Sequence, residues 1–99
     1  MAFMRLAFFP DGREDHWEAV VAEVGDVSAP VARRAFAAGP ADGGWQVMQL
    51  WDTRADLEQF NNEVFLPAMV RIGGRGFPQP PTVRDVDTVK AWVGGQELA

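Results

Sequence analysis

The sequence predicts an α+β protein of the ferredoxin-like class, with elements in the order β-α-β-β-α-β. Three observations support this: two segments with the apolar spacing of an amphipathic helix, four apolar segments beside them, and a turn-rich stretch between the two middle strands. In this class both helices pack on one face of a four-stranded antiparallel sheet. A chain of 99 residues has the size of one domain, so we assign residues 1–99 to one unit.

The first strand and the first helix are predicted over residues 3–9 and 12–24. Pro10 ends the apolar strand, and Asp11 and Glu14 have the spacing of a capping box at a helix start. The positions that follow at i, i+3, i+4 and i+7 are all apolar: Trp17, Val20, Val21 and Val24. This spacing places them on one face of a helix.

The middle of the chain is predicted to form an antiparallel hairpin. Residues 26–31 connect the first helix to a strand at 32–38, which is rich in alanine and therefore weak by strand propensity. The stretch 39–44 contains three glycines and a proline, which predicts a turn. The next strand, 45–51, completes the hairpin.

A second helix is predicted from residue 53, because Thr53 and Asp56 repeat the capping-box spacing. Its apolar stripe consists of Leu57, Phe60, Val64, Ala68 and Ile72. Pro67 lies inside this stripe and lacks a backbone N–H, so we expect a kink or break near residues 63–66. Gly73 ends the helix.

The remainder of the chain is predicted to contain a loop, a strand and a tail. Residues 75–82 hold three prolines and a glycine, which favours an extended loop. The last strand is predicted at 83–93, with a bulge because its apolar residues do not alternate cleanly. We expect residues 94–99 to be a frayed tail.

The strand at 45–51 carries apolar residues on both of its faces, which indicates burial on both sides. The two helices cover one face of the sheet, and a chain this short has no other element for the second face. We therefore expect a homodimer in which two sheets pack face to face as an α+β barrel. The alternative is a two-layer monomer whose second face is only half apolar.

One segment resembles a known family. Residues 44–53 read Gly-Trp-Gln-Val-Met-Gln-Leu-Trp-Asp-Thr, and Phe60 and the run Phe65-Leu66-Pro67-Ala68-Met69 follow. This pattern resembles the antibiotic biosynthesis monooxygenase-like (ABM) superfamily of dimeric α+β barrels. The resemblance implies that fold and a role among cofactor-independent oxygenases, haem-degrading oxygenases, polyketide cyclases or lyases. The haem-degrading branch uses a tryptophan and a histidine where this chain has Phe60 and Val70, so histidine ligation of haem is not expected.

Composition excludes several classes of partner. The formal net charge is -5 and the isoelectric point is near 4.6, whereas nucleic-acid binding requires a basic surface. No apolar run approaches the length of a membrane span. The chain has no cysteine, which suits a reducing compartment, and its first residues do not resemble a signal peptide. We expect a cytoplasmic bacterial protein that binds neither nucleic acid nor membrane.

Three polar residues are candidates for catalysis: His16, Arg33 and Asn62. His16 is the only histidine and so the only side chain whose ordinary pKa lies near neutrality. An inward arginine would stabilise negative charge, and Asn62 precedes the expected helix break. The alternatives are an exposed helix position for His16 and Asn62, and an ion pair with Asp85 or Asp87 for an arginine on a neighbouring strand.

Aromatic residues are abundant for so small a domain, with four Trp and seven Phe. The residues expected beside the space between sheet and helices are Trp17, Phe36, Trp45 and Phe60. They form either the wall of a pocket for a flat apolar ligand or simply the packed core.

We therefore predict a small enzyme of secondary metabolism that acts on an aromatic or polyketide-like substrate in a cleft between sheet and helices, by oxygenation or cyclisation. No metal and no cofactor are expected, because one histidine without cysteine provides few metal ligands and no glycine-rich phosphate loop follows a strand. The alternative is a ligand-binding or structural dimer of the same fold without catalytic activity.

Overall fold

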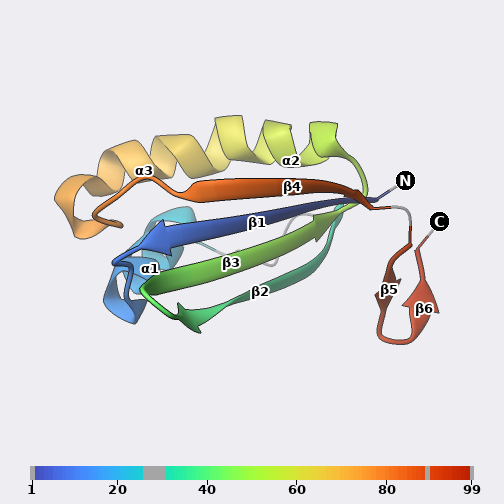
Figure 1. The fold of residues 1–99 in the computed structure, drawn as a ribbon. Coiled ribbons are helices and arrows are strands. Elements are labelled where there is room, and N and C mark those ends of the chain that lie inside the picture. The colour runs from blue at the N-terminus through green and yellow to red at the C-terminus, as the bar shows by residue number, and fades with distance from the viewer. Residues whose placement is uncertain (1, 26–30, 89, 99) are drawn as a thin grey trace.

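A computed structural model describes residues 2–25, 31–88 and 90–98. It confirms the ferredoxin-like class: the main sheet has four antiparallel strands in the order β2-β3-β1-β4. Figure 1 shows this sheet with the helices beside it. The elements are β1 (Ala2–Pro10), α1 (Glu14–Val24), β2 (Arg33–Ala41), β3 (Gly44–Trp51), α2 (Arg54–Phe60), the π-helix η1 (Asn61–Phe65), α3 (Leu66–Ile72), the 3-10 helix η2 (Gly73–Arg75), β4 (Thr82–Thr88), β5 (Trp92–Val93) and β6 (Gln96–Glu97).

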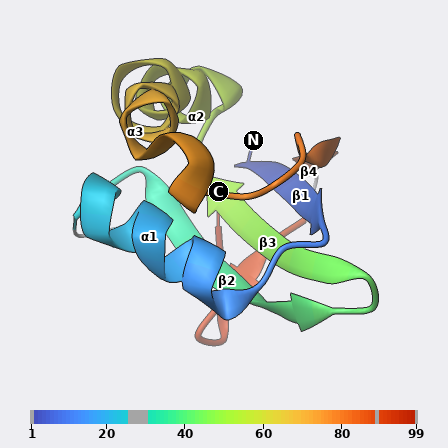
Figure 2. The same ribbon diagram turned by 90° about the vertical axis from the view of Figure 1, so that its left-hand side faces the viewer.

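The helices cover one face of the sheet, as Figure 2 shows. Because side chains alternate along a strand, the odd-numbered residues of β1 and β3 share this covered face. They supply a large part of the core: Phe3, Ala7, Phe9, Trp45, Val47 and Trp51 are all buried. Val20 of α1 and Leu57 of α2 are buried against them, at 2% exposure each. The apolar stripes predicted from the sequence therefore face the sheet.

Helix α1 is capped differently from the sequence prediction. The capping box joins Arg13 and His16, and the imidazole Nδ1 of His16 accepts a hydrogen bond of 3.0 Å from the backbone N–H of Arg13. Asp11 instead lies in the turn before the helix with a positive φ of 59°. The tight turn after β1 thus moves the cap two residues along the chain, and the helix begins at Glu14 rather than at residue 12.

The central hairpin agrees with the prediction, although β2 is longer. It spans Arg33–Ala41, and the turn shrinks to Asp42 and Gly43, because the alanine-rich end of the strand pairs with β3 as far as Ala41 opposite Gly44. The register shifts between Arg33 and Ala35. Most of the expected connector, residues 26–30, and Val89 of the expected last strand lie outside the described residues.

The second helical segment begins as predicted, since the hydroxyl of Thr53 accepts a hydrogen bond of 3.1 Å from the backbone N–H of Asp56. The expected break takes the form of the π-helix at Asn61–Phe65, between α2 and α3. Pro67 follows at the start of α3. Proline cannot donate to the carbonyl four residues earlier, and the wider π-turns before it accommodate that missing donor.

The C-terminal segment differs from its prediction. Strand β4 ends at Thr88, and residues 92–97 form a two-stranded hairpin, β5 and β6, in place of a continued strand and a frayed tail. Gly94 and Gly95 have φ values of 58° and 82°, which a two-residue hairpin turn requires. The buried Ala91, with Leu98, packs against Ala2 and Leu50 at one end of the sheet.

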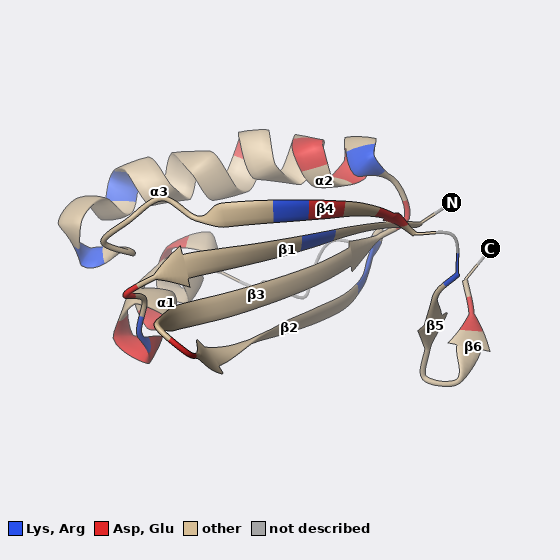
Figure 3. Ribbon diagram, in the orientation of Figure 1, with Lys and Arg blue, Asp and Glu red and all other residues tan. Residues whose placement is uncertain are grey.

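The sheet face away from the helices is largely apolar. The even-numbered residues of β1 and β3 point to this side, and the large apolar side chains of Met4, Leu6, Phe8 and Met48 among them are half-buried. Figure 3 shows that β3 carries no charge along its length, and that charges on the sheet concentrate on β1, β4 and the start of β2. Among the described residues, no helix is long and apolar enough to cross a membrane.

Candidate functional site

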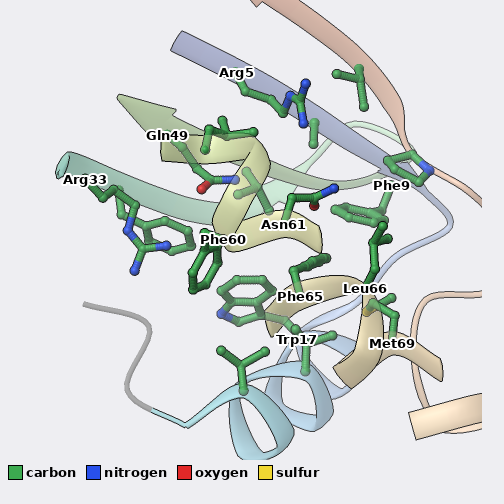
Figure 4. A pocket seen from close by; sticks show the side chains of 18 residues that line it. Arg5, Phe9, Trp17, Arg33, Gln49, Phe60, Asn61, Phe65, Leu66 and Met69 are labelled. Atoms are coloured by element: carbon green, nitrogen blue, oxygen red, sulfur yellow. The ribbon is translucent and has the colours of Figure 1, made fainter. Parts of the chain in front are cut away.

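A pocket of about 300 Å³ lies between the covered face of the sheet and the helices. Figure 4 shows it from close by. Strands β1 to β4 supply one wall, and α1, α2, the π-helix and α3 supply the other. The residues that line it are Arg5, Ala7, Phe9, Trp17, Val20, Val24, Arg33, Phe36, Val47, Gln49, Leu57, Phe60, Asn61, Phe65, Leu66, Met69, Pro81 and Val83.

Aromatic rings form much of the wall. The ring of Trp17 on α1 stacks on that of Phe36 on β2, with centroids 5.6 Å apart and planes 19° apart. Phe60 and Phe65 approach from the helical side, and Phe9 from β1. Flat rings on several sides of one cavity favour a planar apolar ligand, because stacking and edge contacts add to the area that such a ligand buries.

Arg33 brings a positive charge to this aromatic wall. Its guanidinium carbon lies 4.7 Å from the ring centroid of Phe36, 5.4 Å from that of Phe60 and 5.6 Å from that of Trp51. These distances are within the range of cation–π attraction. The rings therefore hold the guanidinium at the edge of the pocket, where it can stabilise a negative charge on a ligand.

Gln49 is a polar residue on the sheet wall, near the C-terminal end of β3. Its Oε1 atom accepts a hydrogen bond of 3.0 Å from the indole N–H of Trp51, two residues along the same strand face. Trp51 is only 1% exposed and contacts Phe60, with ring centroids 5.5 Å apart. A buried and packed indole thus fixes the orientation of the Gln49 amide.

Arg5 is the second cation of the lining, and it is engaged in an ion pair. Its Nε and Nη2 atoms donate to the two carboxylate oxygens of Asp85 at 2.8 and 3.0 Å, across the β1–β4 pairing. The hydrogen bonds from Arg5 hold the pKa of the Asp85 carboxyl below its usual range. This is the cross-strand pairing that the sequence offered as an alternative to a ligand contact for the strand arginines.

Asn61 is the polar residue on the helical wall, and it is the first residue of the π-helix. Single π-turns inside α-helices occur often at functional sites, because the extra residue turns side chains away from their regular positions. Figure 4 shows Asn61 on the helix wall and Gln49 on the sheet wall of the same pocket.

The structure brings together four of the seven residues that the sequence singled out. Arg33, Trp17, Phe36 and Phe60 all line the pocket. Trp45 is buried in the core beside Trp17, with ring centroids 6.3 Å apart, but is not part of the lining.

His16 and Asn62 lie elsewhere. His16 caps α1 through its Nδ1 atom and contacts the edge of Phe77, at a centroid distance of 5.8 Å. Asn62 is exposed, and its neighbour Asn61 occupies the pocket wall instead. Neither predicted residue lines the pocket, so neither is placed to touch a ligand bound there.

Gln49 and Asn61 were not among the residues predicted from the sequence. For Gln49 the sequence does contain a signal. Residues 45, 47, 49 and 51 share one strand face, and on this face Gln49 is a polar residue between apolar ones. For Asn61 no such pattern exists, because the choice between two adjacent asparagines depends on helical phase, which the π-turn changes.

Comparison with known proteins identifies similar folds. No family model and no curated protein matches the chain. A crystal structure of a candidate antibiotic biosynthesis monooxygenase from Caulobacter crescentus CB15 has a TM-score of 0.71 at 12% identity, covering 89% of this chain and 90% of that chain. Rv0793 from Mycobacterium tuberculosis has a TM-score of 0.67 at 18% identity, covering 90% of this chain and 96% of that chain.

A dimeric protein of unknown function with a ferredoxin-like fold, from Bacteroides fragilis NCTC 9343, has a TM-score of 0.55 at 12% identity and covers 86% of this chain and 94% of that chain. At these identities the likeness concerns the fold, and a fold by itself hosts many activities. The chain therefore shares its fold with structures named as candidate antibiotic biosynthesis monooxygenases and with a protein described as having a ferredoxin-like fold.

Proposed function

We propose that this protein binds a flat aromatic or polyketide-like molecule in the pocket between sheet and helices, and oxygenates or cyclises it without a cofactor. The observation that carries the proposal is the pocket itself: about 300 Å³ of largely apolar space with Arg33, Gln49 and Asn61 at its walls. Such a space holds a ring system and meets its oxygen substituents with a few fixed polar groups. The structural neighbours that are named as candidate monooxygenases support the proposal of an oxygenation reaction.

The chemistry proposed is that of a substrate that supplies its own electrons. An activated CH2 group that is conjugated to a carbonyl through an aromatic ring loses a proton to solvent to give an enolate, and the Arg33 guanidinium stabilises the negative charge. Dioxygen then accepts four electrons from that carbon. One oxygen atom becomes the new carbonyl oxygen and the other leaves as water with the two hydrogens of the CH2 group.

The assembly proposed is a homodimer. The sheet face with Met4, Leu6, Phe8 and Met48 is apolar, and the described helices all lie on the other face. Two copies that join these faces would exclude water from both sheets, which is the usual way to bury an apolar sheet surface. The absence of cysteine supports a cytoplasmic location.

The function is tested with anthrone, a tricyclic ketone with one activated CH2 group, by following oxygen uptake and quinone formation. We expect turnover by the wild type without added metal, flavin or reductant. Arg33→Gln should reduce turnover by about tenfold or more, because it removes the charge beside the developing enolate. Arg34→Gln is the matched control, since Arg34 is exposed and pairs with Asp52 at 2.7 Å.

Equal turnover of anthrone by Arg33→Gln and Arg34→Gln would contradict the role of Arg33. Binding of anthrone without turnover would favour the second candidate function, a carrier or binding protein of the same fold. One observation favours that candidate: His16 lies outside the pocket, and the titratable residues of the described lining are the arginines Arg5 and Arg33. The enzyme must then rely on the substrate's own acidity or on solvent for proton transfer.

A further inference from the structure

We propose that Gln49 determines which ligands the pocket accepts, by presenting only hydrogen-bond donors to it, and that Trp51 enforces this orientation. The pocket then selects a planar ligand with an oxygen acceptor, a ketone, quinone or phenolate oxygen, over a hydrocarbon of the same shape. This inference rests on the proposed ligand pocket and names the polar feature of the ligand.

The orientation of the Gln49 amide follows from its neighbour. An indole N–H is a donor with no acceptor capacity, so only the oxygen end of the Gln49 amide can face the Nε1 atom of Trp51. The NH2 end therefore points away from Trp51. Among the described residues, this NH2 group donates no hydrogen bond, and Gln49 belongs to the pocket lining.

Trp51 is held firmly enough to enforce that orientation. It is 1% exposed, packs in a core cluster with Phe3 and Leu57, and contacts the ring of Phe60. Rotation of the Gln49 amide by 180° would leave this buried N–H facing another donor. An unsatisfied buried donor costs about 1–3 kcal/mol, so the flipped amide is rarely populated.

A ligand oxygen is the natural partner of this NH2 group. A hydrocarbon that fills the pocket would shield the two N–H bonds of Gln49 from solvent and leave them without an acceptor. A ligand that carries only N–H donors at this position would place its donors against the NH2 donors of Gln49, which is unfavourable. Discrimination by a fixed polar group is larger than discrimination by apolar shape alone.

The test compares two probes that differ in one oxygen: 1-tetralone, a bicyclic aromatic ketone, and tetralin, the matching hydrocarbon. Dissociation constants are measured by NMR titration of 15N-labelled protein, which also resolves the side-chain NH2 signal of Gln49 and the indole signal of Trp51. We expect wild type to bind 1-tetralone more tightly than tetralin, and 1-tetralone to shift the Gln49 NH2 signal far more than tetralin does.

Two variants and a control separate the roles. Gln49→Met keeps the length of the side chain and removes both donors, so the preference for 1-tetralone over tetralin should fall by about fivefold, the worth of one hydrogen bond. Gln46→Met is the matched control, because Gln46 lies on the same strand, points to the other face of the sheet and is not part of the lining. It should leave the preference unchanged.

Trp51→Phe tests the positioning role, because it removes the indole N–H and frees the amide of Gln49 to turn. In the wild-type background, Trp51→Phe should lower the preference for 1-tetralone over tetralin. In the Gln49→Met background, where the donors are already absent, Trp51→Phe should lower this preference no further. A merely structural effect of Trp51 would instead weaken both probes equally in either background.

The outcomes distinguish this inference from the function on which it rests. If wild type binds both probes and Gln49→Met shows the same preference for 1-tetralone as wild type, the role of Gln49 is overturned and the proposed pocket is retained. Absence of binding of either probe to wild type would overturn both. The Gln49 NH2 shift in wild type decides the matter independently if a variant does not fold.

Discussion

Arg5 and Asp85 form a bidentate ion pair between β1 and β4, with N–O distances of 2.8 and 3.0 Å. Both side chains are less than a third exposed, at 18% and 25%. The pair lies beside the pocket, at the wall that β4 forms. It also links the edge strand β4 to its neighbour β1.

This ion pair makes stability depend on pH. Arg5 lowers the pKa of Asp85 in the folded protein, so the stabilising contribution is present above the ordinary carboxyl pKa near 4 and is lost as the pH falls through the lowered value. Asp85→Asn should lower the free energy of unfolding by about 1 kcal/mol at pH 7. The difference from wild type should shrink towards zero below about pH 4. Urea denaturation across pH 7 to 2 measures it, and a difference independent of pH would contradict the assignment.

A second prediction concerns the close approach of two strands at Gly44. A Cβ atom at this position would overlap the backbone oxygen of Phe9, and neither backbone can move without disturbing the β1–β3 pairing. Gly44→Ala should therefore reduce the free energy of unfolding by about 2 kcal/mol or more. Thermal unfolding measures the change.

The matched control for Gly44 is Gly74. A Cβ atom there meets no described atom within 4 Å, and the residue lies in the short helix η2. Gly74→Ala should change stability by less than about 1 kcal/mol, in the stabilising direction, because alanine has less backbone freedom to lose. Similar losses from both substitutions would show that the contact with Phe9 is not the cause.

A third prediction concerns the start of α2. The hydroxyl of Thr53 caps the backbone N–H of Asp56, and Leu57, one residue further on, belongs to the core. Thr53→Ala should cost about 1 kcal/mol in the free energy of unfolding, whereas Thr53→Ser, which keeps the hydroxyl, should cost much less. Equal losses in the two variants, measured by urea denaturation, would assign the effect to the methyl group of threonine.

A fourth prediction addresses the apolar sheet face. Leu6 is half-buried at the middle of β1 and points away from the helices. Leu6→Lys should convert a dimer into a monomer at micromolar concentration, because a charge in the joined faces would lose its water without gaining a partner. Light scattering with size exclusion gives the mass. Val70→Lys is the control, as Val70 is 82% exposed on α3. A monomeric wild type would refute the dimer.

Local sequence patterns determined the order of elements and the start of α2. Apolar spacing of three and four residues identifies a helix wherever it lies, and the Thr53 cap depends on residues only three apart. The alternation of side chains along β3 is enough to place Trp45, Val47, Gln49 and Trp51 on one face. For the strand arginines the sequence offered Asp85 or Asp87 as partners, and the strand register selects Arg5 with Asp85.

Only the tertiary structure decided which polar groups meet in the pocket. His16 is used by the cap of α1, and the π-helix before Pro67 brings Asn61 rather than Asn62 to the wall. The bond between Gln49 and Trp51 depends on side-chain rotation within a packed core. These outcomes depend on the phase of helices and on contacts between residues far apart in the chain, which local spacing does not contain. The apolar stripes that form the core are different, because each is written as a regular spacing within a single helix or strand.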